Sequence, residues 1–144
     1  MSQYSNKIFF NNIDRRPRLD KETAAMWLTE VARLEKKKLA SLQYNFCSDG
    51  HLLEMNKNYL QHNTYTDIIT FDLSDQKGLI DADIYISVDR VKENSKAFAE
   101  PVQKEFYRVL VHGLLHLCGY KDKSVKDAAL MREKENYYLR TIIL

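Results

Sequence analysis

The chain is organised around residues 111–122, VHGLLHLCGYKD. His112 and His116 lie four positions apart in a stretch whose apolar residues predict a buried helix. At about 3.6 residues per turn, side chains with this spacing project from one helix face, as metal-binding histidines often do. Gly119 suits the left-handed conformation that ends a helix, and the chain then returns toward the helix end, where Asp122 follows. The segment therefore predicts a metal site of two imidazoles and one carboxylate, with two packed or hydrogen-bonded histidines as the alternative.

Length and composition indicate one domain spanning residues 1–144. Hydrophobic residues make up 44% and charged residues 29% of the chain, as in ordinary globular proteins, and only 4 Gly and 2 Pro leave little room for linkers. The first residues contain no basic segment followed by an apolar one, and no apolar run approaches transmembrane length. We therefore expect a cytoplasmic protein without membrane association, and the oligomeric state stays open.

The two cysteines are expected to be reduced and packed. Cys47 and Cys118 form no CxxC motif, which favours an intracellular protein without a disulfide. Cys118 lies two residues after His116, so on a helix it points away from the face of the histidines. Packing is therefore the expected role of Cys118, rather than metal binding.

The net charge of +2 does not by itself indicate nucleic-acid binding. Basic residues nevertheless cluster in three places: Arg15, Arg16 and Arg18; Lys36, Lys37 and Lys38; and Lys121, Lys123 and Lys126. Such clusters are usually solvated surface, but lysines beside a metal site also suit a polyanionic substrate.

Residue periodicity predicts an α+β domain. Alternating or β-branched stretches predict strands at residues 7–11, around 42–46, at 67–72 and at 83–88. Apolar residues at three- and four-residue steps predict helices at 21–37, from about 51, through 91–98, from Pro101 through the histidines, and at 126–143. Helix caps are expected at Asp20, at Asp49, and at Asp89 or Ser87. We expect one mixed four-stranded sheet packed with about five helices, and a metal site at the end of the most buried helix.

The expected site favours hydrolysis without fixing the base. A divalent ion held by three protein ligands keeps a position open for water, whose pKa it can lower from about 15.7 to about 7. In the HExxH helix of zinc peptidases, a glutamate after the first histidine is the general base, but here that position is Gly113. Peptidase chemistry is therefore disfavoured and the base is unassigned. A glycine at this position also permits close approach of a strand or a substrate backbone.

The segment 112–122 resembles the HGxLHLxGYDH motif of the YbeY family. Further blocks resemble those of the family in the same order, and together they cover about residues 50 to 137. These blocks are Asn56 to Tyr59, Thr66 to Phe71, Ala82 to Ser87, and Met131 with Glu135.

The resemblance implies a function and a ligand set. Members of this family are metal-dependent endoribonucleases, so the chain is expected to be a zincin-like, single-strand-specific enzyme acting in rRNA maturation and ribosome quality control. The implied metal ligands are His112, His116 and Asp122, with Zn²⁺ as the expected ion. Ribosomal RNA and components of the small ribosomal subunit are the expected partners. The alternative is a non-catalytic RNA-binding assembly factor whose metal is structural.

Two positions depart from the family pattern. Asp122 stands where the family has its third histidine, and Leu60 stands where the family has an arginine thought to contact the phosphate backbone. Either another cation, such as Arg108, Lys121 or Lys123, contacts the RNA instead, or catalysis is weaker than the resemblance implies.

Other polar residues near these motifs have two interpretations each. We expect His51 and His62 to be surface residues. Thr66, Asp67 and Asp83 either satisfy the local backbone at turns and strand edges or support the ligands and the substrate.

Overall fold

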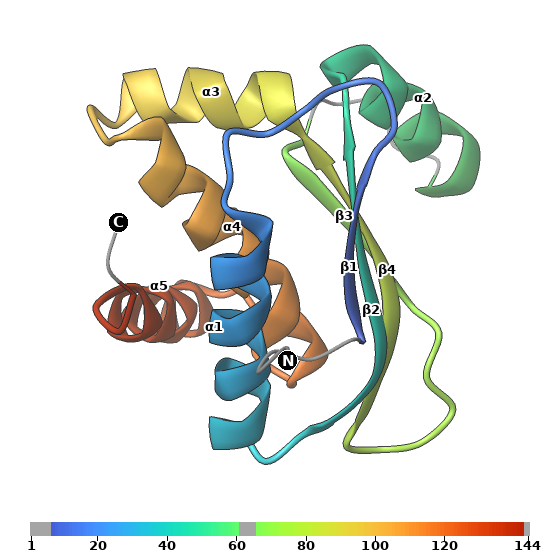
Figure 1. Ribbon diagram of the computed structural model, residues 1–144, viewed down its shortest axis with the longest axis vertical. Helices are drawn as coiled ribbons and strands as arrows, with labels where there is room; N and C mark the ends of the chain where they lie inside the picture. The colour runs from blue at the N-terminus through green and yellow to red at the C-terminus, as the bar shows by residue number, and fades with distance from the viewer. Residues whose placement is uncertain (1–6, 61–65, 143–144) are drawn as a thin grey trace.

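A computed structural model describes residues 7–60 and 66–142, apart from the side chains of Tyr59 and Leu60, and within them it contains four strands and five helices (Figure 1). The elements are β1 (Ile8–Asn12), α1 (Lys21–Leu34), β2 (Lys38–Cys47), α2 (Asp49–Leu60), β3 (Ile68–Asp72), β4 (Leu79–Ser87), α3 (Val88–Ala97), α4 (Val102–Leu117) and α5 (Val125–Leu139). The strand order is β1-β2-β4-β3, with β1, β2 and β4 parallel and β3 antiparallel to β4. The prediction of a mixed four-stranded α+β fold is confirmed.

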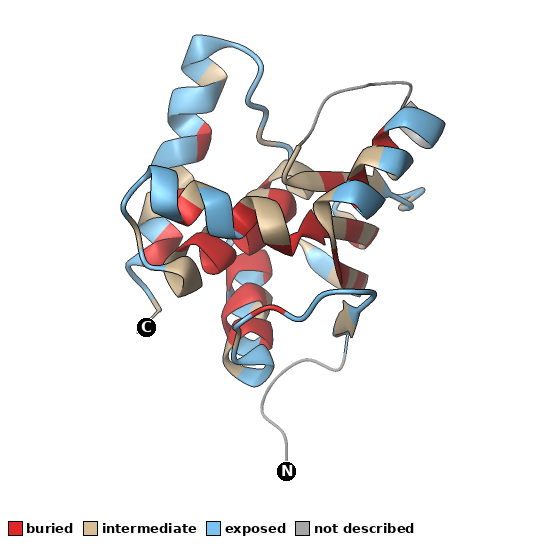
Figure 2. Cartoon of the chain, turned by 90° about the horizontal axis from the view of Figure 1, so that it is seen from above, coloured by how far each residue is buried: buried red, intermediate tan, exposed pale blue. Residues whose placement is uncertain are grey.

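Helices cover the two faces of the sheet unequally. α1, α4 and α5 lie on one face and α2 lies on the other (Figure 1). Since side chains alternate along a strand, Ile84 and Ile86 of β4 enter the main core, while Tyr85 between them packs toward α2. Buried residues gather where helices meet strands, and the outer helix faces are exposed (Figure 2).

Gly113 brings α4 close to the sheet. A Cβ atom at this position would lie 2.9 Å from Cδ1 of Ile84 and 3.0 Å from Cδ1 of Ile68, so any larger residue forces these side chains to move. The predicted close approach of a strand is confirmed. It places the helix that carries the histidines directly against β3 and β4.

Helix caps follow the sequence in two of three places. The side chain of Asp20 accepts a hydrogen bond from the Thr23 N–H at 3.1 Å, and Ser87 caps α3. The prediction of Asp49 as a cap is wrong: Asp49 is already helical, and Ser48 Oγ accepts from the His51 N–H.

Some predicted boundaries differ from the structure. α1 ends at Leu34 instead of residue 37, because Lys36 has a positive φ of 60° and β2 begins at Lys38. β4 begins at Leu79 instead of Asp83, and its polar residues Asp81 and Asp83 alternate with inward-facing apolar ones.

None of the helices in residues 7–60 and 66–142 has the length and apolar character needed to cross a membrane.

Candidate metal centre

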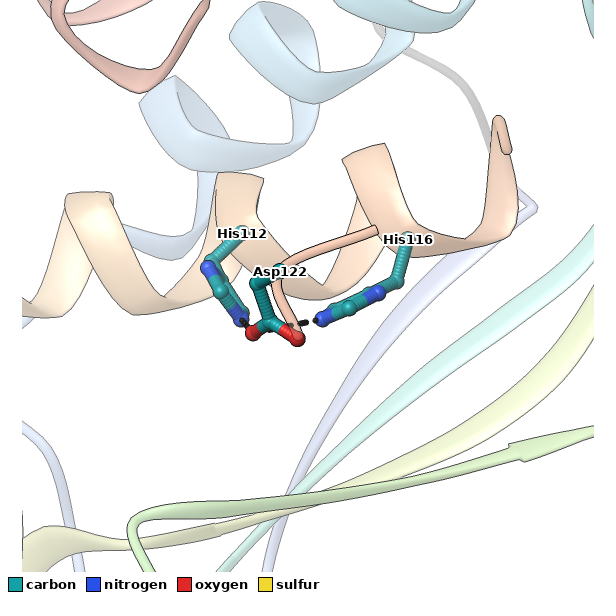
Figure 3. A group of neighbouring side chains, drawn as sticks. All are labelled: His112, His116 and Asp122. Atoms are coloured by element: carbon teal, nitrogen blue, oxygen red, sulfur yellow. Dashed lines mark hydrogen bonds and ion pairs between the residues drawn. The ribbon is translucent and has the colours of Figure 1, made fainter. Parts of the chain in front are cut away.

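The end of α4 turns the chain back toward the histidines. The Gly119 N–H donates to the His116 carbonyl at 3.0 Å, and the Tyr120 N–H donates to the Leu115 carbonyl at 3.1 Å. This pair of bonds, with Gly119 at φ +110°, is a Schellman motif, in which the left-handed residue favours glycine. The following residues therefore fold back, and Asp122 reaches the helix face that carries the imidazoles (Figure 3).

The three side chains converge with the spacing of metal ligands. The carboxylate Oδ2 of Asp122 lies 3.4 Å from Nε2 of His112 and 3.2 Å from Nε2 of His116. One candidate ligand atom from each residue lies within 4.8 Å of the other two. Ligands about 2.0–2.2 Å from a tetrahedral ion stand roughly 3.3–3.6 Å apart, so these two distances are close to those expected around a small divalent ion. The donor set of two imidazoles and one carboxylate also fits, and it leaves a position open.

Glu135 of α5 fixes the orientation of His112. Its Oε2 lies 2.6 Å from Nδ1 of His112, and its Oε1 accepts a hydrogen bond from Arg108 at 3.0 Å. With Nδ1 bound to a carboxylate, Nε2 is left facing Asp122 with its lone pair available for a metal ion. The Glu135 side chain is only 5% exposed, so packing holds this arrangement.

The charges of the site reinforce each other. Burial alone would lower the pKa of His112, but the hydrogen bond to Glu135 and the charges of nearby carboxylates outweigh it and raise this pKa. Burial alone would raise the pKa of Glu135, but the hydrogen bond and charge of His112, followed by the hydrogen bond from Arg108, lower it. Glu135 is therefore a buried carboxylate that its contacts with His112 and Arg108 keep ionised.

A cavity of about 290 Å³ opens beside His112 and Asp122. Its lining includes charged and polar residues of α3, α4 and α5 and of the connection before β3: Asp67, Asn94, Glu105, Arg108, Arg132 and Glu135. Burial is the main cause that raises the pKa of both Asp67 and Glu105. A carboxyl group of this kind, next to an ion site, can exchange a proton closer to neutral pH than an ordinary aspartate can.

The candidate RNA contacts separate in space. Arg108 lines the cavity, its side chain is 13% exposed, and Glu135 holds it in place. Lys121 borders a different hollow, together with Glu35 and Lys37, and Lys123 is exposed.

The remaining candidate residues either have other surroundings or are outside the part of the chain that the structure describes. Cys118 packs against the core, as expected, and His51 is exposed. His62 and the side chain of Leu60 lie outside the described residues. Thr66 satisfies local backbone, because its hydroxyl donates to the Ile68 carbonyl at 3.3 Å, and Asp83 is half-buried within β4.

Sequence reasoning missed the roles of Glu135 and Phe98. Glu135 appeared only as a matching motif residue, and its contact with His112 spans 23 positions, which no local pattern reveals. Phe98 is the C-cap of α3 and lines the cavity although it is 60% exposed. An aromatic residue near the end of an amphipathic helix gave no signal that it would line the same cavity as His112.

Comparisons with known proteins agree with this geometry. A family profile described as "Endoribonuclease YbeY" matches residues 9–143. A protein of that name from Cytophaga hutchinsonii is 54% identical to this chain, in an alignment that covers 76% of this chain and 77% of the relative. Another, from Flavobacterium psychrophilum, is 48% identical, in an alignment that covers 79% of this chain and 81% of the relative. The one in Phocaeicola vulgatus is 42% identical over 89% of this chain and 92% of its own.

A solved structure shares the fold. The solution structure of a Thermotoga maritima protein superposes on this chain with a TM-score of 0.64 and 25% sequence identity. The superposition covers 92% of this chain and 87% of the Thermotoga maritima protein. Because the family profile extends over nearly the whole chain and includes the converging residues of α4, the turn after it and α5, this chain belongs to the YbeY endoribonuclease family.

Proposed function

We propose that this chain is a metal-dependent endoribonuclease that cleaves single-stranded RNA, with ribosomal RNA as its substrate in maturation and quality control. The observation that carries the proposal is the convergence of His112, His116 and Asp122 beside a cavity, in a chain of this family. A divalent ion at this position, for which Zn²⁺ is the expected identity, supplies a Lewis acid that activates water toward phosphorus.

Each residue of the site has a separate task. His112 and His116 would hold the ion from one face of α4, and Asp122 would complete the set from the turn. Glu135 keeps the ring of His112 in the orientation that presents Nε2. Asp67 lines the same cavity, burial raises its pKa, and it is proposed as the group that accepts a proton there.

Arg108 is proposed to bind the substrate phosphate. The family arginine is replaced by Leu60, and Arg108 is a guanidinium in the wall of the cavity, fixed by Glu135 at 3.0 Å. A planar guanidinium matches the oxygens of a phosphodiester in a bidentate manner. Lys121 and Lys123 flank Asp122 in the sequence but do not line the cavity. They are therefore proposed to contact the RNA outside the cleavage site.

The cellular setting is proposed from chemistry and family. Cys47 and Cys118 are both free, which supports a reducing compartment, and we propose the cytoplasm. Components of the small ribosomal subunit are the proposed partners, since the proposed substrate is ribosomal RNA.

Incubation of purified protein with single-stranded RNA, with and without a chelator, tests the proposal. We expect cleavage that the chelator abolishes, that returning Zn²⁺ restores, and that is lost in His116→Ala. His51→Ala is the matched control, because this exposed histidine lies outside the site. RNA binding without cleavage, together with a lower melting temperature after chelation, would instead support the assembly factor with a structural metal.

A further inference from the structure

A second hollow, of about 570 Å³, is lined by residues of α3 and of the connection from β1 to α1. Figure 1 shows this connection running from β1 to α1 near α3. The charged residues of its lining are all cationic: Arg16, Arg18, Lys92 and Lys96. Pro17, Ser95 and Val102 complete the lining, and Pro17 and Ser95 are buried. Its volume is in the range of sites that bind a small molecule or a nucleotide.

Nearby acids do not neutralise these cations. Asp89, Glu93 and Glu100 each pair with another residue: Arg15 at 3.1 Å, Arg90 at 3.0 Å and Lys104 at 3.2 Å, respectively. Among the described residues, none of the four cations of the hollow makes an ion pair. The backbone hydrogen bond from Asp49, the contacts with Arg15 and, to a smaller extent, the charge of Lys92 lower the pKa of Asp89, so one acid partly offsets Lys92. The lining of the hollow itself contains no acid and keeps a positive charge that attracts polyanions.

The hollow and the metal cavity lie on two sides of α3. Lys92 and Lys96 line the hollow, whereas Asn94 and Phe98 line the metal cavity. Successive helical residues are about 100° apart, so these two pairs project from nearly opposite sides of the helix. A helix with its side chains is about 10–12 Å across, which a few nucleotides of an extended strand can span.

An exposed aromatic ring lies at the end of α3. Phe98 is 60% exposed and borders the metal cavity. An unpaired base can stack on such a ring without regard to sequence. One side of α3 therefore offers a candidate ion site with an exposed ring in the same cavity, and the other side offers a basic pocket.

We propose that Arg16, Arg18, Lys92 and Lys96 bind backbone phosphates of a single-stranded RNA whose cleavage site lies at the metal centre. The inference rests on the proposed nuclease function for the identity of the polyanion. Each guanidinium group can donate two hydrogen bonds to the oxygens of one phosphate, and the lysines add point charges. Such contacts orient the strand without selecting its sequence.

Binding of a labelled single-stranded RNA to the full chain in chelator tests this inference, because no cleavage is then needed. The test variant is Lys92→Ala/Lys96→Ala, two exposed positions of α3 where alanine favours the helix. The matched control is Lys38→Ala/Lys77→Ala, which removes the same charge from exposed positions at the start of β2 and in the β3–β4 turn. Equal melting temperatures establish that all proteins are folded.

We expect the test variant to bind RNA on the order of ten-fold more weakly, with a smaller effect in the control. In a plot of log affinity against log salt concentration, the slope of the test variant should be shallower by roughly 1.4. This difference corresponds to two lost phosphate contacts at about 0.7 each. Cleavage of a dinucleotide, which is too short to cross α3, should be unchanged in the test variant, while the KM for long RNA rises.

Equal RNA binding by the test and control variants overturns the inference and leaves the nuclease proposal intact. Loss of binding in the test variant, with no cleavage by the metal-loaded wild type, supports the basic pocket and overturns the nuclease proposal. If the wild-type hollow binds inorganic phosphate or a phosphopeptide and long RNA does not compete for that binding, the RNA assignment is wrong.

Discussion

At the scale of single residues, the site depends on carboxylates that are separated from the histidines in sequence. Asp122 comes from the turn after α4 and Glu135 from α5, yet both contact the same imidazole. One carboxylate completes the ligand set and the other fixes the orientation of a ligand. These two tasks call for different substitutions.

Replacing Glu135 with glutamine should weaken metal binding. The amide keeps the shape but loses the charge that holds the Nδ1 proton of His112, and such partners of metal ligands are worth about 10- to 100-fold in affinity. We expect a loss in this range when Zn²⁺ affinity is measured by competition with a chelating dye. The variant should also be less stable to denaturant, because Arg108 loses a buried carboxylate partner.

Glu133→Gln on the exposed side of the same helix is the control for Glu135→Gln. It should leave both the metal affinity and the stability unchanged. Equal affinities in all three proteins would show that His112 is oriented without Glu135.

Replacing Asp122 with histidine should move activity to lower pH. A neutral imidazole in place of a carboxylate leaves one more unit of positive charge at the ion, so water in its coordination shell becomes more acidic. The rise of RNA cleavage with pH should therefore begin at lower pH in Asp122→His than in the wild type. A pH–rate series with an unchanged or upward-shifted profile would count against Asp122 as a ligand.

At the scale of elements, the ends of α1 and α5 hold the turn that carries Asp122. Glu35, the C-cap of α1, accepts a hydrogen bond from the Tyr120 hydroxyl at 2.9 Å and another from Tyr138 of α5. Lys134 of α5 lies 3.7 Å from the same carboxylate. Tyr120 is two residues before Asp122, so this cluster restricts where the third ligand can lie.

Removing the Tyr120 hydroxyl should loosen the turn without unfolding the chain. A single hydrogen bond contributes about 0.5–1.5 kcal/mol, so Tyr120→Phe should weaken Zn²⁺ binding by roughly two- to ten-fold. Titration of metal into the apo protein measures the effect. Tyr137→Phe is the control, since the ring of Tyr137 is 48% exposed and lies beside Tyr138. If Tyr120→Phe binds as tightly as this control, the backbone bonds of the Schellman motif position Asp122 without help.

At the scale of the whole molecule, local patterns predicted elements better than their contacts. The helix of His112, the turn at Gly119 and the alternation of β4 follow from spacing alone, and the structure contains all of them. The strand order, the distance from His112 to Glu135 and the basic hollow beside α3 depend on how whole faces pack. Residues 16–18 and 92–96 lie more than 70 positions apart, so no sequence window contains both.

The two cysteines report on the stability of the whole fold. Cys47 is fully buried under α2, and burial raises its thiol pKa to about 12, with nearby aspartates adding to the shift. Burial, followed by the charge of Glu35, raises the pKa of Cys118 to about 12 as well. Only about one thiol in ten thousand is then ionised at pH 8, and the thiolate is the reactive form.

Alkylation of the native protein should therefore be slow and should keep accelerating as pH rises. At pH 8 we expect iodoacetamide to modify both thiols on the order of a thousand-fold more slowly than in denaturant, where the ordinary pKa of about 8.5 applies. Between pH 7 and pH 10 the native rate should rise about ten-fold per pH unit, without the levelling expected for the unfolded chain. Cys118, half-buried at the end of α4, should react before Cys47, which requires α2 to leave the sheet. Peptide mass spectrometry after timed labelling measures each site, and a Cys47 rate that levels near pH 8.5 would show that α2 opens freely in the native state.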